Sequence, residues 1–150
     1  MNHLAFVHAN VAAKILNGTK VIESRLSVNC PPAWKVQVGD SIYFKVTGGN
    51  VVAQAIVIGV DKLESLRPVD IPTLAELYSP AMGTSPLNPY WQLKVRSRYA
   101  VMIHLGNVQP CYIPASKVPK GIQSGWVTNF QVGEESTNPQ LLLLPFFPTV

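Results

Sequence analysis

The chain has 150 residues, of which 47% are hydrophobic and only 13% are charged. This length is typical of a single domain with a core of ordinary size, and the composition excludes a disordered chain. Lys and Arg outnumber Asp and Glu by 12 to 8, and this basic balance, with a pI near 9.2, favours an anionic partner.

The first predicted elements are a strand and a short helix. An apolar run at residues 4 to 7 indicates a buried strand. Apolar side chains then recur at helical spacing over residues 11 to 17, with Asn10 as the expected N-cap. Gly18 follows where a helix of this phase needs a left-handed residue to end. Because so short a helix is not stable alone, we expect it to pack on a sheet.

Charge is concentrated directly after this helix. Lys20, Glu23 and Arg25 lie close together in a chain that has few charged residues. The β-branched pair Val21 and Ile22 favours an extended chain, whose period of two puts Val21, Glu23 and Arg25 on one face. From composition alone, Glu23 and Arg25 would form an exposed ion pair that contributes about 0 to 1 kcal/mol.

Prolines and glycines divide the next part of the chain into strands. Pro31 and Pro32 end regular pairing, because proline has no N–H to donate. Residues 41 to 46 are predicted to be a strand, and the Thr-Gly-Gly-Asn stretch at residues 47 to 50 indicates a hairpin turn. The hairpin returns as a long β-branched strand at residues 51 to 60.

Beyond the hairpin, the pattern predicts a second short helix and a long loop. Thr73, with Glu76 three residues later, forms a capping box for a helix at residues 74 to 78. Residues 79 to 92 contain several prolines and a glycine but almost no periodic apolar pattern. A loop of this length inside a compact domain is typical of a functional lid or a disordered excursion.

Three further strands are predicted at residues 93 to 105, 111 to 113 and 126 to 130. In the first of them, Arg96 and Arg98 lie on the same side. Both arginines belong to a long acid-free stretch, because no Asp or Glu occurs from residue 77 to residue 133. An anionic partner is the natural interpretation, although an ordinary solvated face would have the same composition.

The last residues, 131 to 150, are predicted to lie outside the main domain, which spans residues 1 to 130. Residues 131 to 139 are polar and are expected to be a linker. The apolar stretch at residues 141 to 147 is interrupted by proline and is too short for a membrane span, which needs about 20 residues. We expect it to pack on the domain or on a second copy in a homodimer, because exposed apolar runs promote association.

Cysteine and histidine spacing predicts neither a disulfide framework nor a metal centre. Cys30 and Cys111 form no C-x-x-C pair, so free thiols are expected. His3, His8 and His104 have no partners at metal-ligand spacing, and neither a metal nor another cofactor is expected. The N-terminus has no secretory signal pattern, so the expected location is the cytoplasm.

Two stretches resemble the ASCH domain family, a branch of the PUA-like superfamily. Residues 18 to 25 match its G-x-K-x-x-E-x-R signature, which follows a short amphipathic helix. Residues 36 to 44, Val-Gln-Val-Gly-Asp-Ser-Ile-Tyr-Phe, are similar to the family's next strand. The resemblance covers roughly the first 60 residues and the strand at residues 99 to 105, and the order of these elements is more specific than either motif.

The resemblance implies an α+β fold, a PUA-like mixed β-pseudobarrel with two or more short helices. The predicted elements agree with it, since they do not alternate as in a parallel doubly wound sheet. We expect the barrel to be closed by the strands around Val21, Ile42, Val57 and Val101, with the helix near Val11 over one opening.

ASCH-like proteins are known as RNA-binding or RNA-processing modules, so the resemblance implies a basic cleft for single-stranded RNA or a nucleotide. Cations would contact phosphate, and an aromatic ring, with Tyr90 as one candidate, would stack on an unpaired base. Tyr43 is explained equally well as a core residue. The expected ligand-binding residues are Arg25, Ser24, Tyr43, Lys45, Trp91, Arg96 and Arg98.

A hydrolase is the alternative, and the residues leave open whether the chain is an enzyme. Lys20 is the candidate base or nucleophile, because burial beside Arg25 would lower its pKa, and Glu23 would hold it or move a proton. A branch of ASCH-like amidohydrolases acts on acylated cytidines with a Lys, Thr and Glu set. Lys20 matches that lysine, but Glu23 stands where the branch has threonine, and the later glutamate would be Glu64 or Glu76. The other hydrolase hypothesis is a ribonuclease.

Overall fold

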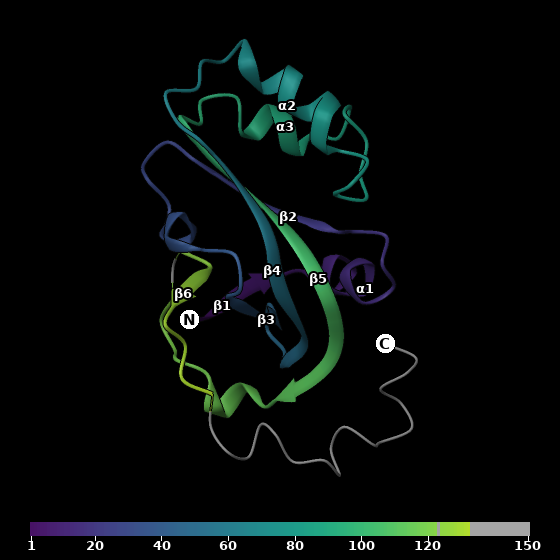
Figure 1. Cartoon of the computed structure of the whole chain (residues 1–150), viewed down its shortest axis with the longest axis vertical. Helices are drawn as coiled ribbons and strands as arrows, with labels where there is room; N and C mark the ends of the chain where they lie inside the picture. The colour runs from purple at the N-terminus through teal and green to yellow at the C-terminus, as the bar shows by residue number, and fades with distance from the viewer. Residues whose placement is uncertain (123, 133–150) are drawn as a thin grey trace.

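A computed structural model describes residues 1–122 and 124–132 of the chain. Its centre is one six-stranded mixed sheet that curls into a half-barrel (Figure 1). The strands are β1 (Asn2–Val7), β2 (Ile22–Ser27), β3 (Ser41–Val46), β4 (Val51–Leu63), β5 (Tyr99–Ile113) and β6 (Trp126–Thr128). They lie in the order β2-β5-β4-β3-β1-β6, and among these described strands only β1 and β3 pair in parallel. The predicted α+β mixed pseudobarrel is therefore confirmed.

The described residues also form three short α-helices, α1 (Ala9–Leu16), α2 (Asp70–Tyr78) and α3 (Tyr90–Leu93), and two 3-10 helices, η1 (Pro32–Lys35) and η2 (Ala115–Lys117). α2 and α3 lie together beyond one end of the half-barrel, whereas α1 lies beside β5 (Figure 1). Ala12 and Ile15 of α1 are buried in the same apolar cluster as residues of β3, β4 and β5. α1 therefore packs on the sheet, as its short length requires.

The period of two along β2 and β5 decides which helix each side chain meets. Val101 of β5 packs in the cluster under α1, whereas Met102 packs with α2 and α3. On the neighbouring strand, Ile22 also packs in the α2 and α3 cluster. Glu23 and Arg25 alternate with it and point to the other face of the sheet. The face predicted for these two side chains from the sequence is confirmed.

The strand predicted at residues 93 to 105 is wrong at its start. Leu93 ends α3, and residues 94 to 98 form turns, so Arg96 and Arg98 do not share one side of a strand. Short helices of this kind carry no long apolar repeat. Their position is decided by a tertiary contact, here the burial of Trp91.

At its other end, β5 runs on to Ile113 and absorbs the separate strand predicted at residues 111 to 113. The strand passes through Pro110, which lies opposite Ala53 of β4. Register shifts in β4 on both sides of this pair accommodate the proline, because a bulge leaves positions where no N–H is needed. β6 is shorter than predicted and ends at Thr128.

Both longer helices begin before their predicted first residues. α1 starts at Ala9 with His8 in the N-cap position, so Asn10 is inside the helix and does not cap it. α2 starts at Asp70, not after the capping box at residues 73 to 76. The Asp70 carboxylate accepts a hydrogen bond of 2.8 Å from the backbone N–H of Arg67. Its negative charge at the first residue of the helix also interacts favourably with the positive end of the helix dipole.

Residues 79 to 92, predicted as a lid or a disordered excursion, are hydrogen-bonded turns that lead into α3. The Met82 N–H donates to the Tyr78 carbonyl at 3.0 Å. The Trp91 indole N–H donates to Ser79 Oγ at 3.0 Å, and both side chains are buried. These contacts attach the segment to α2 and hold it next to β2.

Arg25 connects the two edges of the sheet, β2 and β6. From β2, its guanidinium donates hydrogen bonds to the Phe6 carbonyl at 3.1 Å and to the Gly125 carbonyl, beside β6, at 3.3 Å. It also lies 5.1 Å from the centre of the Trp126 ring, within cation–π range. The barrel predicted as closed is therefore an open half-barrel, and Arg25 bridges its seam, the gap between β2 and β6.

The predicted linker from residue 133 onward and the apolar stretch at residues 141 to 147 lie outside the described residues, as does residue 123. None of the described helices is long and apolar enough to cross a membrane. Cys30 is exposed, Cys111 is buried, and both are free thiols.

Replacing Arg25 with alanine should lower the melting temperature. The variant loses two charge-assisted hydrogen bonds across the seam, which together contribute about 2 to 4 kcal/mol, or roughly 5 to 15 °C for a domain of this size. Thermal unfolding followed by circular dichroism measures the shift. Arg96→Ala removes the same charge from an exposed position and should stay within about 0.5 kcal/mol of the parent. Equal melting temperatures for the two variants would contradict the bridging role of Arg25.

Candidate functional site

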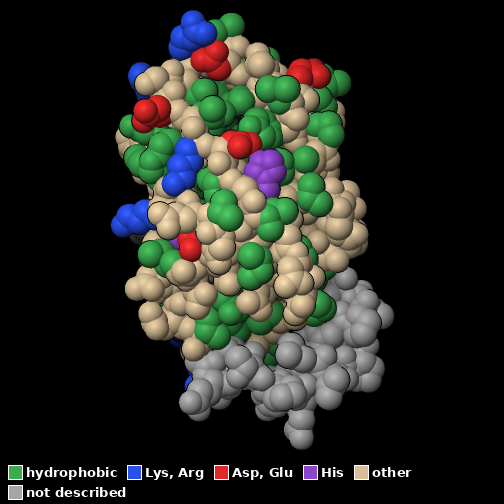
Figure 2. Space-filling view, viewed as in Figure 1, with side chains coloured by type: hydrophobic (Ala, Val, Ile, Leu, Met, Phe, Trp, Pro, Cys, Tyr) green, Lys and Arg blue, Asp and Glu red, His purple; other side chains and the backbone are tan. Residues whose placement is uncertain are grey.

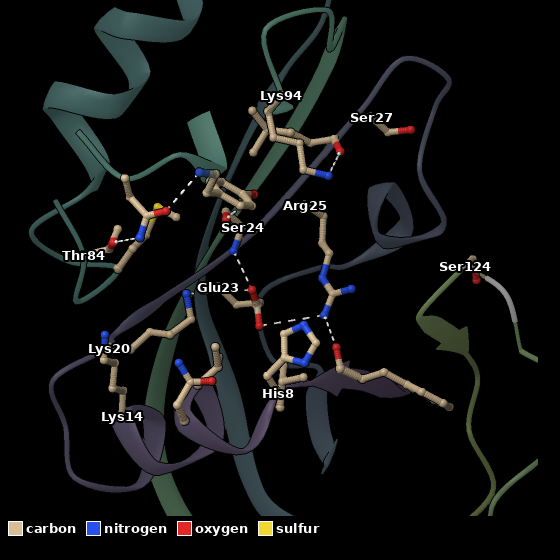
Figure 3. A pocket seen from close by; sticks show the side chains of 18 residues that line it. His8, Lys14, Lys20, Glu23, Ser24, Arg25, Ser27, Thr84, Lys94 and Ser124 are labelled. Carbon is tan, nitrogen blue, oxygen red and sulfur yellow. Dashed lines mark hydrogen bonds and ion pairs between the residues drawn. The ribbon is translucent and has the colours of Figure 1, made fainter. Parts of the chain in front are cut away.

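A cavity of about 570 Å³ lies at the seam, between β2, the start of α1 and the segment that leads into α3 (Figure 3). Its walls contain more basic than acidic side chains. The charged lining residues are Lys14, Lys20, Glu23, Arg25 and Lys94. On the face shown in Figure 2, by contrast, Lys and Arg side chains are scattered along one edge and form no broad patch. The cavity thus groups four of the twelve Lys and Arg side chains of the chain.

The end of α1 positions Lys20 in the cavity wall. Gly18 has a φ of 83°, the left-handed conformation predicted for it after the helix. The Thr19 N–H then donates to Asn17 Oδ1 at 2.8 Å, and the Lys20 N–H donates to the Lys14 carbonyl at 3.0 Å. This tight turn brings two lysines to the same side of the cavity, as Figure 3 shows.

Lys20 is a buried lysine with one weak ionic partner among the described residues. Its side chain is 7% exposed, and Nζ lies 3.8 Å from Glu23 Oε1. Burial lowers the pKa of Lys20; the charge of Glu23 opposes this shift, and Arg25 and Lys14 add to it. The amine therefore loses its proton more readily than an ordinary lysine, which suits a base or a nucleophile.

Glu23 lies between Lys20 and Arg25 on the cavity side of β2 (Figure 3). Its Oε1 accepts a hydrogen bond of 2.9 Å from the backbone N–H of Ser24. Its Oε2 lies 3.8 Å from Arg25 Nη2 and has no hydrogen-bond partner among the described residues, although it is buried. A buried carboxylate oxygen without a donor is unfavourable unless a ligand or water supplies one.

Tyr90 and Lys94 form the opposite wall of the cavity. The Tyr90 hydroxyl and Ser24 Oγ are 3.0 Å apart, and Lys94 Nζ donates to the Leu26 carbonyl at 3.3 Å. Burial raises the pKa of Tyr90, and the charge of Glu23 adds to the shift. Burial lowers the pKa of Lys94, and Arg25 adds to that shift. The two side chains attach the α3 segment to β2.

Of the residues predicted to form the site, the structure brings Lys20, Glu23, Ser24 and Arg25 together in the cavity. The other five do not line it. Tyr43 is buried against an aromatic ring in a separate cluster, and Lys45 lies over the Phe6 ring at 5.2 Å. Trp91 belongs to α3 and is buried against α2. Arg96 and Arg98 are exposed and lie outside the cavity.

Sequence reasoning did not select Lys14 and Lys94 for the site, and it gave Tyr90 only as an alternative. Lys14 was hidden within an apolar helical repeat, and its Nζ donates to the Gly83 carbonyl at 2.9 Å. Lys94 was placed on a strand, whereas it follows α3 in a turn. The sequence could have indicated Tyr90. Trp91 is the buried residue of α3, and because adjacent residues of a helix point in different directions, Tyr90 could be expected to point elsewhere.

Two histidine and carboxylate pairs lie outside the cavity. His104 Nε2 is 2.9 Å from Asp61 Oδ2, which also accepts a hydrogen bond of 2.8 Å from Tyr78. Burial, together with the hydrogen bond to Asp61 and the charge of that carboxylate, raises the pKa of Tyr78 to about 12. His3 Nε2 is 2.8 Å from Asp40 Oδ2. Asp61 looked isolated in the sequence but joins α2 to the sheet. In residues 1–122 and 124–132, no three His, Cys, Asp or Glu side chains are grouped to hold a metal.

Solved structures with a similar fold carry the family name that the sequence motif suggested. An ASCH protein from Zymomonas mobilis aligns with a TM-score of 0.64 and 16% identity, over 95% of this chain and 94% of the other. A serine-to-alanine mutant of that protein aligns with a TM-score of 0.65 and 15% identity, over 93% and 94% of the two chains. No family profile and no curated protein matches the sequence. The fold is therefore that of ASCH structures.

Replacing Lys20 with methionine should keep or raise the melting temperature at neutral pH. Because the pKa of Lys20 is lowered in the folded protein, the charged amine destabilises the fold below that pKa, and methionine fills a similar volume. Glu23 keeps Arg25 as an ionic partner at 3.8 Å, and its loss of the Lys20 charge offsets part of the gain. The gain should shrink as pH rises from the lowered pKa towards that of an ordinary lysine, where the parent protein loses the penalty.

Thermal unfolding at several pH values measures this difference. Lys35→Met is the matched control, because Lys35 is exposed and lies outside the cavity. A fall of several degrees for Lys20→Met, with no fall for Lys35→Met, would show that Lys20 stabilises the fold and would argue against a functional role for its burial.

Proposed function

We propose that this protein is an ASCH-type module that binds a nucleotide, free or as part of a single-stranded RNA, in the cavity at the seam. The observation that carries the proposal is the composition of the walls: four basic side chains, one acid and the Tyr90 ring around about 570 Å³. This volume is within the range of about 300 to 1,000 Å³ of small-ligand sites. The ASCH fold supports the same class of function.

The cationic side chains of the cavity differ in how many hydrogen bonds they already donate within the protein. Arg25 donates to two backbone carbonyls across the seam and is committed to the fold. Lys14 and Lys94 each donate to one carbonyl, which leaves two ammonium hydrogens on each for a phosphate. Lysine ammonium groups suit phosphate as point charges. Figure 3 shows Lys14 and Lys94 at opposite ends of the cavity, and Lys94 Nζ lies 5.7 Å from the centre of the Tyr90 ring. We therefore propose that Lys94 contacts the phosphate of a nucleotide whose base lies beside Tyr90.

An unpaired base suits this cavity better than a duplex. A base stacks on an aromatic side chain only when it is not stacked within a duplex, and we propose that the cavity holds one such unstacked base. Arg96 and Arg98 lie outside the cavity, two and four residues beyond Lys94. We propose that they contact further phosphates only when the ligand is an oligonucleotide.

Lys94→Ala should weaken binding of a mononucleotide about tenfold, because it removes one charge-assisted contact to phosphate. Titration calorimetry at several salt concentrations should also show the salt dependence reduced by about one phosphate equivalent. Arg96→Ala is the matched control and should leave mononucleotide binding unchanged while weakening oligonucleotide binding. If the two variants affect a mononucleotide equally, the cavity does not hold the phosphate.

Hydrolysis of RNA or of an acylated nucleoside is a second candidate, favoured by the state of Lys20 and Glu23. Because the pKa of Lys20 is lowered by burial, its amine gives up a proton more readily than an ordinary lysine does, and the unpartnered Oε2 of Glu23 is placed to orient a water. In amide hydrolysis, Lys20 would take a proton from the attacking water and return it to the departing nucleoside amine. Glu23 in place of the threonine of the amidohydrolase branch is the residue that argues against an identical mechanism.

Lys20→Ala and Glu23→Gln should abolish turnover on single-stranded RNA or acylated nucleosides while the circular dichroism spectrum stays unchanged. The rate of the parent enzyme should rise with pH through the lowered pKa of Lys20, because only the neutral amine acts as base. Lys35→Ala, a change of the same charge at an exposed site, should be fully active. Turnover that persists in Lys20→Ala would exclude this residue from catalysis.

A further inference from the structure

The outer edge of β2 forms one side of the cavity, and its backbone groups face the seam. β2 pairs antiparallel with β5 along one edge, with Glu23 opposite Ile103 and Arg25 opposite Val101. The Val21 carbonyl accepts a hydrogen bond from Leu105 at 2.9 Å, which shows that odd-numbered residues turn their backbone groups towards β5. Even-numbered residues therefore turn theirs towards the cavity.

Three contacts cover half of the N–H and C=O groups that residues 22, 24 and 26 turn outward. The Ile22 N–H donates to the Ala81 carbonyl at 3.1 Å, and the Ser24 N–H donates to Glu23 Oε1 at 2.9 Å. The Leu26 carbonyl accepts from Lys94 Nζ at 3.3 Å. Each contact confirms the direction expected from the pairing. Such side-chain caps also prevent another strand from adding to the edge.

The Ile22 and Ser24 carbonyls and the Leu26 N–H remain without a hydrogen-bond partner among the described residues, and of these three groups the last two are next to each other on residues that line the cavity. In an extended strand, the carbonyl of one residue and the N–H two residues later point the same way, as an acceptor beside a donor. Ser24 and Leu26 both line the cavity, so this pair faces the space in which the ligand would lie. Left empty, it would be an unpaired strand edge in the wall of a binding site.

We propose that the Ser24 carbonyl and the Leu26 N–H read the Watson–Crick edge of an unpaired nucleobase. Each base carries on that edge a hydrogen-bond donor next to an acceptor, either an exocyclic amine beside a ring nitrogen or a ring N–H beside a carbonyl. The donor of the base binds the Ser24 carbonyl, and its acceptor binds the Leu26 N–H. This inference rests on the proposed nucleotide binding and adds the groups that recognise the base.

The surroundings of the pair agree with a nucleotide in one orientation. The Tyr90 hydroxyl is 3.0 Å from Ser24 Oγ, so its ring stands next to the acceptor of the pair. Lys94 is bound to the Leu26 carbonyl and carries positive charge beside the donor. A base held by its Watson–Crick edge cannot pair with another strand. The edge of β2 thereby selects single-stranded ligands through hydrogen bonding as well as through size.

Amide hydrogen exchange and chemical shifts of the ¹⁵N-labelled protein test the proposal directly. In the free protein, the Leu26 amide should exchange faster than the Arg25 amide, which is paired with β5. AMP, CMP, GMP and UMP are then added in turn, with ribose 5-phosphate as the probe that lacks a base. The nucleotide that binds best should shift and protect the Leu26 amide, whereas ribose 5-phosphate should leave it unchanged.

A second experiment blocks the Watson–Crick edge of the ligand and leaves the protein unchanged. For the best nucleotide, an analogue methylated on its Watson–Crick edge, such as N6,N6-dimethyl-AMP for AMP, should bind about tenfold more weakly. Equal binding of the analogue, an unchanged Leu26 amide on binding, or a Leu26 amide already protected in the free protein would overturn the inference. In those cases Lys94→Ala would still weaken binding, and the proposed function would stand. Failure of all four nucleotides to bind would overturn both.

Discussion

The bridge made by Arg25 across the seam is the interaction on which this half-barrel depends. A curled sheet that does not close leaves two edge strands, and each edge carries unpaired backbone groups. Here one guanidinium from β2 binds the Phe6 carbonyl of β1 and the Gly125 carbonyl beside β6, and it packs on the Trp126 ring. The bridge holds the edges together without closing the ladder between them. The space left beside it is the cavity.

Burying this guanidinium has consequences for its neighbours. Arg25 Nε has no hydrogen-bond partner among the described residues, and its partner Glu23 has an unsatisfied oxygen. Lys20 lies on the other side of Glu23 and has a lowered pKa, because burial outweighs the attraction of that carboxylate. Groups arranged in this way destabilise the fold unless something binds to them. Departures of this kind from a well-satisfied interior are expected at functional sites.

The α2 and α3 unit completes the site from the far side of β2. Its anchors are the hydrogen bond of Tyr78 to Asp61 and that of Trp91 to Ser79. These contacts fix where α3 ends, and its end determines where Lys94 lies. The site therefore combines residues from the first helix and strand with residues far along the chain. Its chemistry depends on the docking of this helical unit.

The sequence by itself determined the local parts of this protein. The alternation along residues 21 to 26 predicted the face of Glu23 and Arg25, Gly18 predicted the end of α1, and the motif selected Lys20, which lines the cavity. These features depend on interactions between residues close in sequence, where periodicity and backbone preference decide the result. The class of fold followed from their order and from the family resemblance.

Only the tertiary structure decided which distant residues join that motif. Lys94 enters the cavity and Arg96 does not, because the burial of Trp91 against α2 fixes α3 in place and α3 ends at Leu93. No repeat in the sequence marks that point. Lys14 lies in the cavity because the turn at Gly18 returns the chain beside the helix. The unpaired edge of β2 is also a tertiary property, since strand order alone determines which strand lacks a neighbour. Contacts between distant segments are set by packing free energy summed over the whole core, which no local pattern contains.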